Sequence, residues 1–140
     1  MSPAGQGNTL RSVGAVAAGI VAIFVLSLGV DVMLHAAGVY PPLGQPFSSR
    51  LCLLATAYRI LFAVAGGYIT ARLAPDRPMQ HALIYGCVGV VLSLVGAIVT
   101  WNGGPAYGPH WYPIALIVIS LPCAWLGGKF VPMAANPGLE

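Results

Sequence analysis

Charged side chains are scarce in this sequence of 140 residues. They make up 6% of the residues, against 58% that are hydrophobic, whereas soluble domains usually carry about 25% charged residues. Acidic residues are the rarest of these, and Asp31 is the only one before Asp76. The shortage excludes a water-soluble globular domain and predicts an integral membrane protein, with residues 1–140 forming a single membrane domain.

Cysteine is also sparse, and its spacing indicates no chemistry. The three cysteines, Cys52, Cys87 and Cys123, fall at different depths of the predicted helices and form no CxxC pair. We therefore expect neither a disulfide nor a metal site. No nucleophile with a neighbouring base, no pair of carboxylates and no cluster of metal ligands can be assembled from the chain. The sequence predicts a protein that is not an enzyme and needs no cofactor.

Long apolar runs are what the sequence has instead. Crossing about 30 Å of hydrocarbon takes about 20 apolar residues in a helix, and the chain fits four such runs. The predicted helices cover residues 12–38, 51–73, 80–101 and 111–131. Proline and glycine gather in the short connections between them, and the runs lack the period-two alternation of barrel strands. We expect an all-α, four-transmembrane-helix bundle with up-down topology.

The basic residues predict how this bundle is oriented. Positive charge close to the end of a span tends to stay in the cytoplasm. Arg50 alone flanks one side of the predicted helices, and the other side is flanked by Arg11, Arg72, Arg77 and Lys129. We therefore expect both termini to be cytoplasmic. Topology accounts for most of the net charge of +3, so no nucleic-acid partner is implied.

Two formal charges fall inside the predicted spans. Asp31 lies seven residues from Gly38, and Arg59 lies eight residues from Leu51. At about 1.5 Å per residue, both lie roughly 10 to 12 Å below the same membrane surface, on antiparallel neighbours. An unpaired charge near mid-membrane costs at least about 2.5 kcal/mol, so we predict an ion pair between Asp31 and Arg59. The pair is either a structural clip for the first hairpin or a direct participant in ion or substrate movement.

Helical spacing places other polar side chains beside the pair. Ser27 and His35 are one turn away from Asp31 on the same face, and Thr56 shares a face with Arg59. Polar side chains on such a face bond across helices in lipid. Ser27, His35 and Thr56 are therefore candidates for a polar lining near the ion pair.

Small residues mark inward faces on the last two helices. In lipid, small side chains allow helix backbones to approach closely. The residues concerned are Gly86, Gly89, Ser93, Ala97 and Thr100 in the third helix and Ser120, Ala124 and either Gly127 or Gly128 in the fourth. Each helix therefore has a face that we expect to point into the bundle.

His35 can also be interpreted as a metal ligand or as part of a proton relay. It lies near the same membrane surface as His110, and together with Asp31 the two histidines would offer metal or proton-relay chemistry. Two histidines without a third residue at ligand spacing are a weak pattern, and no haem motif accompanies His35. We expect no metal site.

Pro122 interrupts the fourth helix. Proline removes one backbone hydrogen bond and frees a carbonyl group. The sequence predicts a kink there, which serves either as a fixed bend or as a hinge.

Three segments carry a family resemblance: GVDVMLHAAGVYPPLGQP, ATAYRILFAVAGGYITARLAPDRPMQHAL and GPHWYPIALIVISLPCAWLGGKF. They resemble a group of small four-helix bacterial inner-membrane proteins that have no assigned activity. The resemblance covers nearly the whole chain after residue 12. It implies a bacterial origin, an inner-membrane location and four spans, and it implies no activity.

Two functions of different classes are compatible with these features. The first is a small transport or permeation protein that acts as an oligomer, with Asp31 and Arg59 lining or gating the route of a small molecule or ion. The second is a non-catalytic accessory or scaffolding subunit, in which the pair is only a staple. The expected partners are the lipid bilayer and either further copies of the chain or other membrane subunits.

Overall fold

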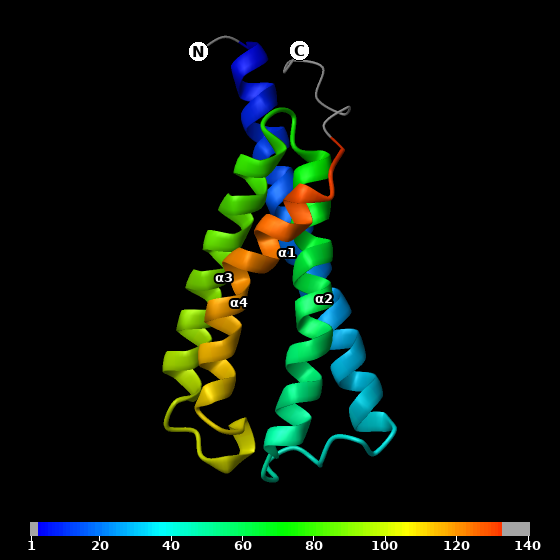
Figure 1. Ribbon diagram of the computed structural model, residues 1–140, viewed down its shortest axis with the longest axis vertical. Helices are drawn as coiled ribbons and strands as arrows, with labels where there is room; N and C mark the ends of the chain where they lie inside the picture. The colour runs from blue at the N-terminus through cyan, green and yellow to red at the C-terminus, as the bar shows by residue number, and fades with distance from the viewer. Residues whose placement is uncertain (1–2, 133–140) are drawn as a thin grey trace.

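The computed structural model describes residues 3–132, which form four long helices and no strand. Their bounds are α1 Pro3–Ala36, α2 Ser49–Leu73, α3 Pro78–Thr100 and α4 Trp111–Lys129, with a 3-10 turn, η1, at Pro105–Tyr107. All four are long and apolar enough to cross a membrane. They run up and down, so that α1 begins and α4 ends at the same end of the bundle (Figure 1). We call this the terminal end, and the end with the α1–α2 and α3–α4 connections the loop end.

The prediction for the start of the first helix is wrong. α1 begins at Pro3 and not near residue 12, and the Thr9 hydroxyl donates to the Gly5 carbonyl oxygen at 2.9 Å within the added turns. Proline is tolerated in the first turn of a helix, and a helix can continue into a polar segment. Apolar length therefore predicts the span and not the end of the helix. The other three helices begin and end within two residues of the predicted bounds.

Local sequence explains where α2 and α3 begin. The Ser48 side chain caps α2 by accepting a hydrogen bond from the Leu51 N–H at 3.4 Å. Pro78 opens α3, and proline disfavours the helical region for the residue before it. Arg77 lies outside that region, but in a left-handed conformation with φ 44° and not in the extended one that a following proline favours. Arg77 and Pro78 together form the tight turn between α2 and α3.

Glycines bring the helix backbones together at the terminal end. A Cβ added to Gly66 would lie 2.9 Å from the Gly19 carbonyl oxygen, and one added to Gly67 would lie 2.9 Å from the Ala124 carbonyl oxygen. A Cβ on Gly127 would lie 2.6 Å from the Tyr68 nitrogen. α1 and α4 therefore both approach α2 to backbone contact, in the way that small residues permit in membrane bundles.

The two hairpins separate toward the loop end. α2 packs against all three other helices, and α1 packs mainly on α2. In Figure 1 the α1–α2 pair and the α3–α4 pair lean apart below their contact at the terminal end. α4 changes direction toward α2 in its second half (Figure 1), the part that contains Pro122, and the helix continues to Lys129.

Candidate functional site

The predicted ion pair is present. Arg59 Nη2 donates to Asp31 Oδ2 at 2.8 Å, across the α1–α2 interface. The side chains of Arg59 and Asp31 are 27% and 25% exposed. The pair therefore joins the two helices of the first hairpin without being sealed between them.

Three tyrosines extend the pair into a network that the depth argument did not predict. The Tyr58 hydroxyl donates to Asp31 Oδ1, and Arg59 Nη1 donates to the Tyr112 hydroxyl. The Tyr40 and Tyr58 hydroxyls lie 2.8 Å apart. Every carboxylate oxygen of Asp31 and both terminal nitrogens of Arg59 thus have a partner, drawn from α1, α2 and α4.

The connection after α1 holds Tyr40 in this network. The Tyr40 backbone N–H donates to the Leu34 carbonyl oxygen at 3.1 Å, and the Tyr40 ring packs edge-on against Phe47 with the centroids 4.8 Å apart. Tyr40 forms a buried cluster with Ala55 and Tyr58. Burial raises the pKa of the Tyr40 phenol above its ordinary value, so the phenol keeps its proton at neutral pH.

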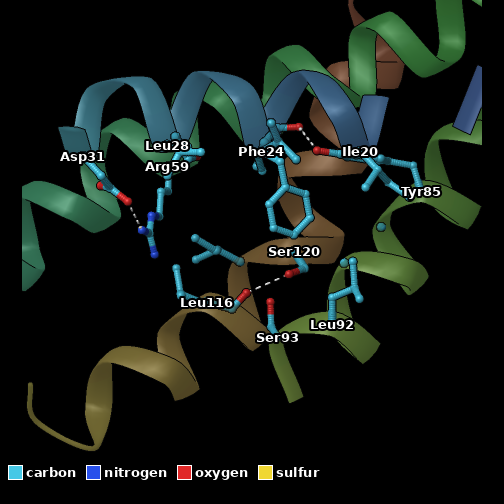
Figure 2. Close-up of a pocket in the computed structure, with 16 residues that line it drawn as sticks. Ile20, Phe24, Leu28, Asp31, Arg59, Tyr85, Leu92, Ser93, Leu116 and Ser120 are labelled. Carbon is cyan, nitrogen blue, oxygen red and sulfur yellow. Dashed lines mark hydrogen bonds and ion pairs between the residues drawn. The ribbon is translucent and has the colours of Figure 1, made fainter. Parts of the chain in front are cut away.

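A cavity of about 370 Å³ lies beside the ion pair, walled by residues from all four helices. Figure 2 shows Asp31 and Arg59 at one end of this cavity and Tyr85 at the other, with the Phe24 ring between them. The wall is mainly apolar, and its other labelled members in Figure 2 are Ile20, Leu28, Leu92, Ser93, Leu116 and Ser120. The site is thus a largely apolar space with one charged, internally neutralised end.

The hydroxyl groups in the wall fall into two kinds. The Ser120 hydroxyl donates to the Leu116 carbonyl oxygen at 2.7 Å, and the Tyr85 hydroxyl donates to the Ala63 carbonyl oxygen at 3.2 Å. Ser27 on α1 and Ser93 on α3 also line the cavity. Within residues 3–132 neither of these two hydroxyls has a hydrogen-bond partner. Both hydroxyls remain free for a bound molecule, whereas Arg59 Nε, which also lacks a partner within that range, is buried.

Of the three residues suggested as a polar lining, only Ser27 is in the cavity wall. His35 lies one turn beyond Asp31 toward the loop end, and its Nδ1 is 2.8 Å from the Asp31 carbonyl oxygen. The Thr56 hydroxyl donates to the Cys52 carbonyl oxygen at 2.8 Å. Both side chains therefore bond to their own helix, and the suggested lining does not extend to them.

The two histidines near the loop end are engaged separately. The His110 ring stacks on Trp101 with the centroids 4.2 Å apart, and its Nε2 is 3.0 Å from the Trp101 carbonyl oxygen. His35 instead packs edge-on against Tyr40. Over residues 3–132 no group of three or more His, Cys, Asp or Glu side chains is placed to hold a metal ion, and the three cysteines are free.

No protein family, no curated protein and no solved structure matches this chain. The ion pair and the cavity beside it therefore have to be interpreted from their own geometry.

Proposed function

We propose that the chain is a small multi-pass protein of a bacterial inner membrane, with its terminal end in the cytoplasm. Four helices of sufficient length and apolarity support membrane insertion. The orientation is supported by the basic residues Arg11, Arg72, Arg77 and Lys129, which lie toward the terminal end. It is also supported by the aromatic residues that gather toward the loop end, namely Tyr40, Trp101, Tyr107, Trp111 and Tyr112.

Within that membrane, the proposed activity is transport or permeation of a small molecule. One observation carries this proposal: Asp31 and Arg59 line the cavity between the two hairpins. Charged groups inside a membrane bundle typically mark a substrate or ion pathway. An ion pair that only fixed the first hairpin would not require a cavity beside it.

The packing favours a carrier over an open pore. At the terminal end, Gly19 and Gly66 bring α1 and α2 to backbone contact, which leaves no room for a molecule to pass between these helices. Movement through the protein then requires the hairpins to shift relative to one another. The bent second half of α4, with Pro122, is the proposed hinge, and an oligomer would supply the neighbouring surface against which the hairpins move.

The alternative is an accessory or scaffolding subunit, and the free surface of α1 favours it. A Cβ on Gly14 or Gly29 would meet nothing within 4 Å, so both positions offer close approach to another helix. In this alternative Asp31 and Arg59 only fix the first hairpin. Crosslinking of the purified protein in lipid would distinguish a homo-oligomer from a monomer that awaits other subunits.

Flux from liposomes tests the transport proposal. The wild-type protein and Asp31→Asn are reconstituted at equal density, and proton entry is followed with a dye in the lumen alongside release of small neutral, anionic and cationic solutes. We expect the wild type to exceed empty liposomes for at least one of these, and Asp31→Asn to change that rate. If the variant is folded and no flux is seen with either protein, the transport proposal fails.

A further inference from the structure

We infer that the cavity between α1 and the α3–α4 hairpin binds an uncharged, mostly apolar molecule that carries a hydroxyl or carbonyl group. The inference deepens the proposed function, because it names the class of molecule that the route would hold. It depends on the shape of the cavity, on its balanced charge and on its two free hydroxyl groups.

The cavity is of a size that binds small molecules and is open on one side. Its volume of about 370 Å³ lies in the range of small-ligand pockets, about 300 to 1,000 Å³. Phe24 and Leu28 line it and are still 60% and 64% exposed, and Leu92 on the facing helix is 44% exposed. The wall therefore opens between α1 and α3, which in the proposed orientation is toward the hydrocarbon of the bilayer. A molecule that enters there has to be largely apolar.

The charged end of the cavity selects against a charged ligand. Asp31 and Arg59 neutralise each other at 2.8 Å, and their remaining contacts go to Tyr58 and Tyr112. A ligand with a net charge would bring an uncompensated charge into an apolar space, which is strongly unfavourable. A neutral polar group adds no charge to the pair.

Two hydroxyls distinguish the cavity from a groove that only accommodates lipid chains. Thr56, Thr100 and Ser120 each donate to the carbonyl oxygen one turn earlier in their own helix, at 2.7 to 2.8 Å. Ser27 and Ser93 face the cavity and make no such bond within the described part of the chain. They come from different helices, and each can accept a hydrogen bond from a ligand hydroxyl or donate one to a ligand hydroxyl or carbonyl oxygen, bonds that an acyl chain cannot make.

Photolabelling in liposomes tests this inference without measuring flux. The probe is a photoreactive long-chain alcohol, compared with the alkyl sulfate and the alkyl trimethylammonium of the same chain. We expect saturable labelling of α1 and α3 peptides by the alcohol, displaced by excess unlabelled alcohol. The two charged probes should label the same peptides about tenfold less.

A matched pair of glycine variants locates the site. Gly89 lines the cavity, and a Cβ there would lie 3.5 Å from the Ser120 Cβ and Oγ, which is an ordinary contact. A leucine side chain at this position is therefore tolerated and fills the cavity. A Cβ on Gly96, two turns along the same helix, meets nothing within 4 Å. We expect Gly89→Leu to abolish saturable labelling and Gly96→Leu to leave it unchanged.

A second variant leaves the shape of the cavity intact. Removing the hydroxyls in Ser27→Ala/Ser93→Ala should weaken labelling by the alcohol about fivefold, because about one neutral hydrogen bond is lost. Labelling that is equal for all three probes, or that persists in folded Gly89→Leu, would mean that only bulk lipid chains contact the cavity and would overturn the inference. Selective labelling without flux would leave the site standing and reject transport, whereas flux without selective labelling would do the reverse.

Discussion

Arg59 joins three helices because its guanidinium has two terminal nitrogens. One donates to Asp31 on α1 and the other to Tyr112 on α4. A lysine ammonium is a single point and cannot reproduce this fork. Leaving either charge of the pair without its partner would be strongly destabilising, because an unpaired charge in a membrane bundle has no compensation. The stability of the first hairpin therefore depends on the pair being kept or removed as a whole.

Arg59→Ala should lower the free energy of unfolding by about 3 kcal/mol, since it leaves the Asp31 carboxylate without its counter-charge. The double variant Asp31→Asn/Arg59→Ala should regain much of that loss, because the uncompensated charge is gone. Unfolding by a denaturing detergent, followed by circular dichroism, measures both. If the double variant is no more stable than Arg59→Ala, the two residues do not act as a pair.

Tyr58→Phe should lower the free energy of unfolding by about 1.5 to 3 kcal/mol, the usual range for a lost hydrogen bond to a charged group. Tyr58 is the second donor to Asp31, and phenylalanine keeps the ring and removes only the hydroxyl. Tyr107→Phe is the control, because Tyr107 is 56% exposed and its hydroxyl makes no hydrogen bond within residues 3–132. Equal effects of the two substitutions would contradict a role for Tyr58 in holding the carboxylate.

Depth along a helix predicts the Asp31–Arg59 pair but not its tyrosines. Tyr112 is the second residue of α4, close to the loop end, whereas the Cα of Arg59 lies farther from that end, within α2. The long Arg59 side chain carries its charged group away from its own Cα, as arginines in membranes often do. Only Tyr58, next to Arg59 in sequence, offered a signal, because a buried phenol needs a partner.

Small residues determine which helices are in contact. The seams at Gly19, Gly66, Gly67 and Gly127 leave no space for a methyl group. The same residue type elsewhere is free, since a Cβ on Gly14 meets nothing. Small residues spaced four apart in a helical sequence therefore do not reveal which of them makes the contact between helices.

Gly19→Ala should destabilise the bundle by about 1 to 3 kcal/mol, because overpacking a close contact forces the backbone to move. Its Cβ would lie 2.6 Å from the Gly66 carbonyl oxygen. Gly14→Ala, five residues earlier on the same helix, should be neutral or slightly stabilising, since alanine favours the helix by about 1 kcal/mol. Both are measured by the same detergent unfolding. A destabilisation of the same size at Gly14 would contradict the assigned seam.

Periodicity predicts the four helices and much of their inward faces. Gly86, Gly89 and Ser93 were expected to point inward and do line the cavity, and Ala97 and Ala124 are buried. The cavity itself could not be predicted. Its existence depends on the angle at which the two hairpins separate, and that angle is set by contacts between residues far apart in sequence.

The bundle is closed at its two ends in different ways. Backbone contacts through glycine close the terminal end. At the loop end the two connections are tied together, because the Phe47 N–H donates to the Pro105 carbonyl oxygen at 2.9 Å. The cavity lies between these closures, with the Asp31–Arg59 pair in its wall. A molecule that enters the cavity from the open side between α1 and α3 is therefore bounded at both ends, and its passage to either end of the bundle requires that closure to open.

Filling the cavity tests directly whether it is the route of transport. Flux of whichever solute the wild type moves is compared for Gly89→Leu, which fills the cavity, and Gly96→Leu, which places the same side chain outside it. Neither substitution touches the ion pair. The expectation is that Gly89→Leu reduces flux to the level of empty liposomes while Gly96→Leu retains the wild-type rate. Equal, wild-type rates for both folded variants would contradict it.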